Sequence, residues 1–163
     1  MTWLDYAVAG VLAVSVAVGA WRGLVREIVS LAGWVIAFLA ANLLAGPLAV
    51  QLPAGIPSAE LRALAAFVAV FVATLVLASL MALLLSRLAR AAGLGGVDRT
   101  LGALFGLARA AILLAAFALV AGLTSLPRQP AWKGSLSGPW LGAAAIALRP
   151  WLPPAFGERL RYD

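Results

Sequence analysis

The chain contains no cysteine and no histidine, and only 11% of its 163 residues are charged. Without cysteine, neither a disulfide framework nor a thiol nucleophile is available. The lack of histidine removes the commonest general base. Together the two absences exclude ordinary zinc sites and haem ligation by histidine. We therefore expect no metal and no cofactor, and an enzyme is the least favoured class.

Apolar residues dominate instead and make up 64% of the chain, whereas soluble domains are about half apolar and roughly 25% charged. They form four blocks long enough to cross a bilayer, which needs about 20 apolar residues per helix. These blocks are residues 3–21, 28–45, 61–85 and 104–126. None carries the polar stripe of a water-soluble bundle. The first block is not a signal peptide, because no basic residue precedes Arg22. The composition predicts an all-α polytopic membrane protein with four transmembrane helices.

The composition changes after residue 126. Residues 127–140 are rich in proline, glycine and serine, and the apolar run 140–148 is too short to span a bilayer at about 1.5 Å per residue. Trp140 and Trp151 flank this run, and tryptophan is enriched at membrane interfaces. We predict a four-helix transmembrane domain over 1–126 and, over 127–163, a tail with one short interfacial or extramembrane helix.

The net charge of +6 comes from basic residues scattered beside the spans, so they are interpreted as topology signals and no nucleic-acid partner is expected. The first and third connections hold Arg22, Arg26, Arg87, Arg90 and Arg99. The opposite side holds Arg62, Arg128 and Lys133 near the membrane. The positive-inside rule then places the first and third connections in the cytoplasm and both termini outside.

The connections differ in length and composition. Residues 21–27 are so few that the first two helices are expected to form an antiparallel hairpin, with Gly23 in the left-handed conformation that ends a helix. Three prolines within 46–58 predict a loop. Ser58 is the expected N-cap of the third helix, with Glu60 in its first turn.

The fourth span combines charge with small residues. Asp98 suits an N-cap, and a helix from 98 to 126 would be about 43 Å long, more than the hydrocarbon thickness of about 30 Å. Gly102, Gly106 and Ala110 recur every fourth residue, a spacing that lets two backbones approach closely. Asp98 and Arg109 lie about three turns apart, on this same face. The charged groups should therefore point towards another helix.

A charge within a span usually faces the bundle interior and has a partner, which Arg109 requires. The segments "GAWRG" (19–23) and "GLARA" (106–110) share one pattern, which suggests similar depths for Arg22 and Arg109. We hypothesise a cytoplasmic-side polar cluster with Glu27 as the favoured partner of Arg109, the other candidate being Asp98 of a second copy. Its members are Arg22, Arg26, Glu27, Asp98, Arg99 and Arg109, and the helix-packing glycines are Gly19, Gly23, Gly102 and Gly106. Alternatively, Arg22, Arg26 and Arg99 are ordinary positive-inside residues solvated by headgroups.

Three segments together resemble the bacterial colicin V production protein (CvpA-like) family: "DYA" (5–7), "RGLVREIVSLAGW" (22–34) and "GLGGVDRTLGALFGLARA" (93–110). That family has an Asp-Tyr near its N-terminus, an Arg-Gly-x-x-Arg-Glu element, and an Asp-Arg-x-Leu-Gly element followed by Gly-x-x-Arg-Gly. The resemblance covers about residues 3–126. Ala110 stands where glycine is usual, and the tail matches only loosely.

The resemblance implies a four-span protein of the bacterial inner membrane, linked to bacteriocin (toxin) production and envelope robustness. The favoured function is a non-enzymatic scaffold or accessory factor in bacteriocin export and envelope maintenance. The alternative is a small channel or transporter, which four spans could form only as a homo-oligomer. An intramembrane aspartyl enzyme is disfavoured because Asp5 and Asp98 fall on opposite sides in this topology. The expected partners are the lipid bilayer and either a second copy or other membrane proteins.

Overall fold

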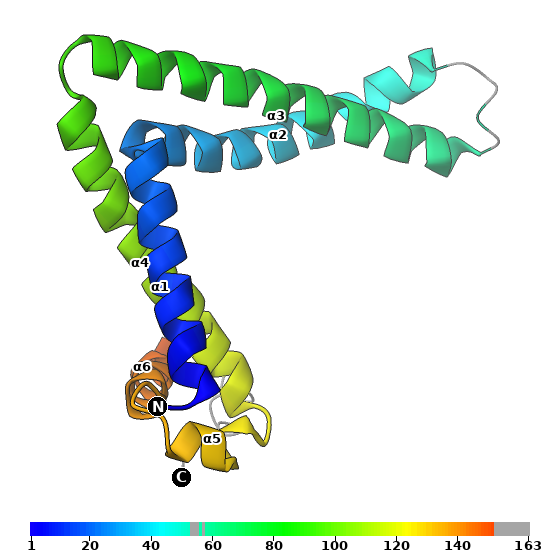
Figure 1. Cartoon of the computed structure of the whole chain (residues 1–163). Coiled ribbons are helices and arrows are strands. Elements are labelled where there is room, and N and C mark those ends of the chain that lie inside the picture. The colour runs from blue at the N-terminus through cyan, green and yellow to red at the C-terminus, as the bar shows by residue number, and fades with distance from the viewer. Residues whose placement is uncertain (53–55, 57, 152–163) are drawn as a thin grey trace. The chain divides into compact units, whose positions relative to one another are not determined.

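In the computed structural model, residues 1–52, 56 and 58–151 are described, and within these ranges the chain is helical with no strand. The four long helices are α1 (Trp3–Arg22), α2 (Leu24–Gln51), α3 (Ala59–Ala91) and α4 (Gly95–Gly122) (Figure 1). The tail comprises η1 (Leu126–Arg128), α5 (Pro130–Lys133), α6 (Gly138–Leu148) and η2 (Arg149–Trp151). All four long helices are apolar and long enough to cross a membrane. The predicted all-α class, with four spans and a short tail helix, is confirmed.

The chain divides into two compact units, a first unit of Met1–Trp21 with Ala103–Asp163 and a second unit of Arg22–Gly102. We describe each by itself. The hairpin expected of the first two spans therefore stays a prediction, as does the division at residue 126.

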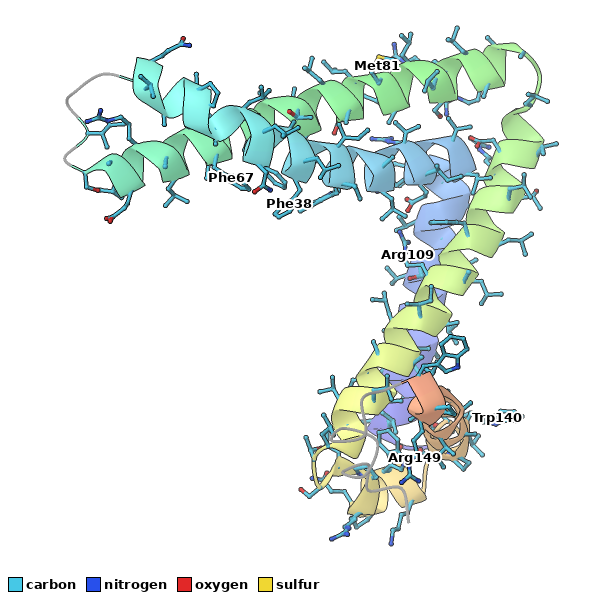
Figure 2. The ribbon with its side chains drawn as sticks, turned by 180° about the vertical axis from the view of Figure 1, so that it is seen from behind. Phe38, Phe67, Met81, Arg109, Trp140 and Arg149 are labelled. Atoms are coloured by element: carbon cyan, nitrogen blue, oxygen red, sulfur yellow. The ribbon has the colours of Figure 1, made fainter. Side chains whose placement is uncertain are left out.

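In the second unit, α2 and α3 pack side by side along their length (Figure 1). A β-carbon at Gly33 of α2 would lie 2.7 Å from Cβ of Ala78 on α3, so the two backbones approach closely there. Further along, Phe38 meets Phe67 edge to face with ring centroids 6.1 Å apart; Figure 2 labels both side chains on the neighbouring helices. Small residues and interlocking rings thus hold this pair together.

In the first unit, the tail helices pack against α1 and α4. One buried core joins all four helices and consists of Leu4, Ala118, Ala121, Trp132, Leu141 and Ala145. Phe117 of α4 also stacks on Trp132 of α5, with ring centroids 6.3 Å apart. The tail is therefore bound to the first and fourth spans through its own apolar face.

One predicted boundary is wrong in the segment around Pro47. The expected loop over 46–58 begins only after Gln51, because α2 continues through Pro47. Proline removes one backbone hydrogen bond, and helices within membranes tolerate this loss more often than soluble ones. Ser58 does cap α3 as predicted, accepting a hydrogen bond from the Leu61 amide at 3.2 Å. Residues 53–55 and 57 of the predicted loop lie outside the described residues.

The predicted start of the fourth helix is also wrong. α4 begins at Gly95, and the Asp98 amide donates to the Leu94 carbonyl at 2.9 Å, so Asp98 lies inside the first turn and is not its N-cap. The chain reverses within three residues after α3, using Gly93 at φ +79°. This tight turn allows the new helix to begin earlier. α4 ends at Gly122, four residues before the predicted end.

Candidate functional site

The carboxylate of Asp98 caps the N-terminus of α2 and not that of its own helix. Its Oδ1 accepts a hydrogen bond from the Val25 amide at 2.9 Å, across 73 positions of sequence. α2 has no cap from its own side chains, because the residue before it is Gly23. Asp98 is only 6% exposed. A negative charge here satisfies a free N–H group and complements the positive end of the helix dipole.

Gly23 makes this contact possible. Its φ of +82° was expected from the sequence, although ψ is extended at +158°. A β-carbon at Gly23 would lie 2.6 Å from Cγ of Asp98 and would also collide with its Oδ2. Any other residue at this position would therefore suffer both an unfavourable φ and a clash with the capping carboxylate.

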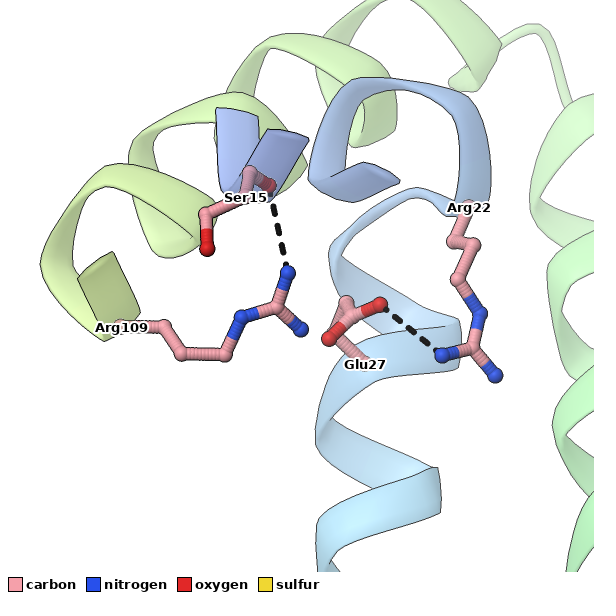
Figure 3. Close-up of polar contacts among 4 residues, drawn as sticks. All are labelled: Ser15, Arg22, Glu27 and Arg109. Carbon is pink, nitrogen blue, oxygen red and sulfur yellow. Dashed lines mark hydrogen bonds and ion pairs between the residues drawn. The ribbon is translucent and has the colours of Figure 1, made fainter. Parts of the chain in front are cut away.

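A second acidic side chain lies in the first turn of α2. Glu27 is buried, and its Oε1 pairs with Nη1 of Arg22 at 3.3 Å (Figure 3). The side chain of Arg22 is 35% exposed, so the pair joins a buried carboxylate to a half-buried guanidinium. The position of Glu27 also suits the helix dipole. The beginning of α2 is thus held by two carboxylates, one from α2 and one from α4.

Arg109 of α4 contacts the backbone of α1. Its Nη2 donates to the Ser15 carbonyl at 3.2 Å (Figure 3), and Ser15 is buried. One turn before Arg109, a β-carbon at Gly106 would collide with this same carbonyl and lie 3.1 Å from Cα of Val16. The glycine therefore lets the two backbones approach closely, and the arginine bonds across the contact.

The six residues of the hypothesised cluster have different environments. Two contacts form within the second unit: Glu27 pairs with Arg22, and Asp98 caps the start of α2. Arg26 is half-buried and Arg99 exposed. In the part of the chain that is described, neither side chain makes a hydrogen bond or ion pair. The alternative, that these two are ordinary positive-inside residues, stays a prediction. Arg109 belongs to the first unit, so its pairing with Glu27 stays a prediction.

The four predicted packing glycines, Gly19, Gly23, Gly102 and Gly106, are all buried. Ala110 is buried as well, so the small-residue face of α4 is covered.

Sequence reasoning missed one polar contact, between Asp5 and the tail. Oδ1 of Asp5 accepts from the amide of Ser137 at 2.9 Å and from its hydroxyl at 2.7 Å, while Oδ2 accepts from the Thr2 amide at 2.8 Å. Ser137 is the N-cap residue of α6, and its side chain does not cap that helix. The available signals were an acidic residue in the first turn of a span and a Ser-Gly-Pro helix start.

Four cavities among the described residues lie away from these charges. The largest, about 510 Å³, lies within the tail, lined by Trp132, Lys133, Pro139 and other tail residues. Others of about 260 to 360 Å³ lie along the apolar helices. None of the six charged residues lines them. The described residues also contain no group of three acidic side chains that could hold a metal ion.

Comparison with known proteins places the chain in a family. The family described as Colicin V production protein matches residues 4–146. The "Colicin V production protein homolog" of Haemophilus influenzae is 36% identical over 140 residues, which cover 85% of each chain. No solved structure matches. The family match extends beyond residue 126 and includes α5 and most of α6, which agrees with the packing of the tail on α1 and α4. The chain is therefore a membrane protein with four apolar helices, and it belongs to the colicin V production protein family.

Proposed function

We propose that this chain is a non-enzymatic protein of the bacterial inner membrane that acts as a scaffold or accessory factor in bacteriocin export and envelope maintenance. The observation that carries the proposal is the use of Asp98. This buried carboxylate accepts a hydrogen bond from a backbone amide at the start of another helix, so its role is structural. Catalysis or ion transport would instead require a carboxylate that substrate or solvent can reach.

The other polar contacts support the same role. Glu27 pairs with Arg22, Arg109 bonds the backbone of α1, and Asp5 holds the start of α6. All of these contacts fix helix ends or helix crossings. The Haemophilus influenzae relative is described as a colicin V production protein homolog, which supports the link to colicin V production.

The proposal is tested with two variants of Asp98, one that removes only the negative charge and one that also removes the oxygen that caps α2. Asp98→Asn keeps an oxygen that can accept from Val25, and asparagine caps helices about as well as aspartate. Asp98→Leu removes the acceptor at similar size. We expect a strain that lacks the native gene to regain bacteriocin release and envelope resistance with the wild type and with Asp98→Asn, but not with Asp98→Leu.

Accumulation in the membrane fraction is measured for each variant. If the role of Asp98 is structural, its loss impairs function by destabilising the fold. Asp98→Leu should therefore also accumulate poorly. The proposal is wrong if Asp98→Asn accumulates normally and yet loses all function, because the negative charge itself would then be needed.

The alternative function is a small oligomeric channel or transporter. It is favoured by the two glycines with positive φ, Gly23 before α2 and Gly93 after α3, which separate consecutive helices at the same end of the α2 and α3 pair. Interrupted helices can build ion sites in transporters. Ion flux through proteoliposomes tests this function, and Asp98→Asn would then be expected to change the flux.

A further inference from the structure

The strongest unexplained feature of the spans is Asn42, which lies exposed on α2. Between residues 28 and 50 the only other polar side chain is that of Ser30. Asn42 is about 21 Å from the start and about 12 Å from the end of this apolar stretch, at 1.5 Å per residue. It therefore lies within the hydrocarbon layer, where an amide without partners is costly.

The amide is only partly satisfied within its own chain. Nδ2 of Asn42 donates to the Phe38 carbonyl at 2.9 Å, one turn earlier in the same helix. Among the described residues, nothing donates to Oδ1. A second donor and an acceptor thus remain for a partner outside α2.

The exposed side chain of Asn42 lies beside the contact with α3 and not at its closest approach, because Phe38, one turn earlier, still meets Phe67 of α3. Gly33, which contacts α3, lies nine residues before Asn42, or about two and a half turns, and so is on the opposite side of α2. Val35 and Gly46 share the face of Asn42, at seven residues before it and four after it. Both are exposed, and a β-carbon at Gly46 would have no neighbour within 4 Å. A small residue next to an amide is the pattern that brings transmembrane helices together.

We propose that this face of α2, containing Leu31, Val35, Asn42 and Gly46, binds the same face of a second copy of the chain. The other spans offer few polar groups: residues 7–14, 63–73 and 110–123 contain none. A second copy, related by a two-fold axis along the membrane normal, places its own Asn42 at the same depth. Two amides there satisfy each other, because each has a donor and an acceptor. This inference does not depend on the proposed function.

The absence of cysteine makes the test direct. Val35→Cys and Ile36→Cys are matched variants at adjacent positions, 61% and 55% exposed, and they point about 100° apart. Each chain then has a single thiol, so a disulfide can form only between two copies. In vesicles of phosphatidylethanolamine and phosphatidylglycerol at high lipid-to-protein ratio, we expect oxidation to cross-link Val35→Cys and to leave Ile36→Cys largely monomeric.

Asn42→Leu in the Val35→Cys background should weaken the association about three- to thirty-fold, the range for hydrogen bonds between transmembrane helices. Asn42→Gln should keep most of it. Equal cross-linking of Val35→Cys and Ile36→Cys would overturn the inference, and so would cross-linking unaffected by Asn42→Leu. Failure of Val35→Cys to cross-link would also overturn the inference, because another surface or protein would then cover Asn42. Bacteriocin release is a separate measurement, so failure here leaves the proposed function unaffected.

Discussion

At the residue scale, the polar side chains of the spans act on backbone groups of distant segments. Asp98 accepts from Val25, Arg109 donates to Ser15, and Asp5 accepts from Ser137. A buried polar group that loses its partner destabilises the fold, so each such contact is costly to remove. These contacts determine which helix ends and crossings come together.

The conformation of Gly23 leads to a prediction with an internal control. Gly23 and Gly93 both have positive φ, at which alanine is strained by roughly 1–3 kcal/mol through the backbone alone. Only at Gly23 does the new β-carbon also meet Asp98, since the space beside Gly93 is open. Gly23→Ala should therefore lower the free energy of unfolding by about 1 kcal/mol more than Gly93→Ala, because it also displaces a helix cap. Denaturation of both variants in lipid micelles measures this difference, and equal losses would contradict it.

The predicted pair of Glu27 and Arg109 is tested by a double-mutant cycle. If the two side chains compensate each other, Glu27→Gln and Arg109→Gln should each abolish accumulation, at a cost of several kcal/mol for a buried charge left alone. The double variant should then be no worse than either single one. Arg22→Gln is the control, because Arg22 also pairs with Glu27 but is partly exposed. Additive losses with unchanged folding would mean that Glu27 and Arg109 act separately.

At the scale of elements, small residues set the distance between α1 and α4. The crossing places Gly106 directly against the backbone of Ser15 and Val16, which cannot move aside as a side chain can. The helices are thus held by backbone proximity, with Arg109 bonding across the same contact.

Replacing Gly106 with leucine should therefore separate the two helices, and Gly102→Leu is predicted to do the same. Gly96→Leu is the matched control on α4, because a β-carbon there would have open space. A cysteine pair at Val8 and Leu114, which line one cavity, reports the contact by disulfide formation. If Gly106→Leu still forms this disulfide and keeps function, the glycine is incidental.

The contact between Asp5 and Ser137 predicts that the tail can be released by one change. Asp5→Ala removes the acceptor for both groups of Ser137, so α6 should detach more readily and be cleaved several-fold faster by added protease. Asp5→Asn keeps an oxygen acceptor and should behave more like the wild type. Unchanged cleavage of Asp5→Ala would show that the apolar core alone holds the tail.

At the scale of the whole molecule, an even number of spans predicts that both termini lie on one side of the membrane. The arginines of the first and third connections predict that this side is the periplasm. Reporter fusions after Gly55 and at the C-terminus should therefore both report an external location. A cytoplasmic signal from either fusion would refute the topology, and with it the location proposed for the tail.

The number and positions of the spans, the cap at Ser58 and the short tail helix were determined by the sequence itself. Apolar length, helix periodicity and caps depend on residues close together in the chain, so local rules are enough to find them. The same rules failed at Pro47, where the membrane tolerates a missing hydrogen bond, and at Asp98, which looked like the cap of its own helix.

The tertiary structure alone decided which backbone groups the charged residues satisfy. Asp98 meets Val25 across 73 positions, and Asp5 meets Ser137 across 132. No local pattern specifies such partners, because a carboxylate can cap any helix start that the fold brings within about 3 Å. Each apolar residue favours the bilayer through its own transfer free energy, which depends only on the local sequence. Polar contacts between segments form only after the helices have come together.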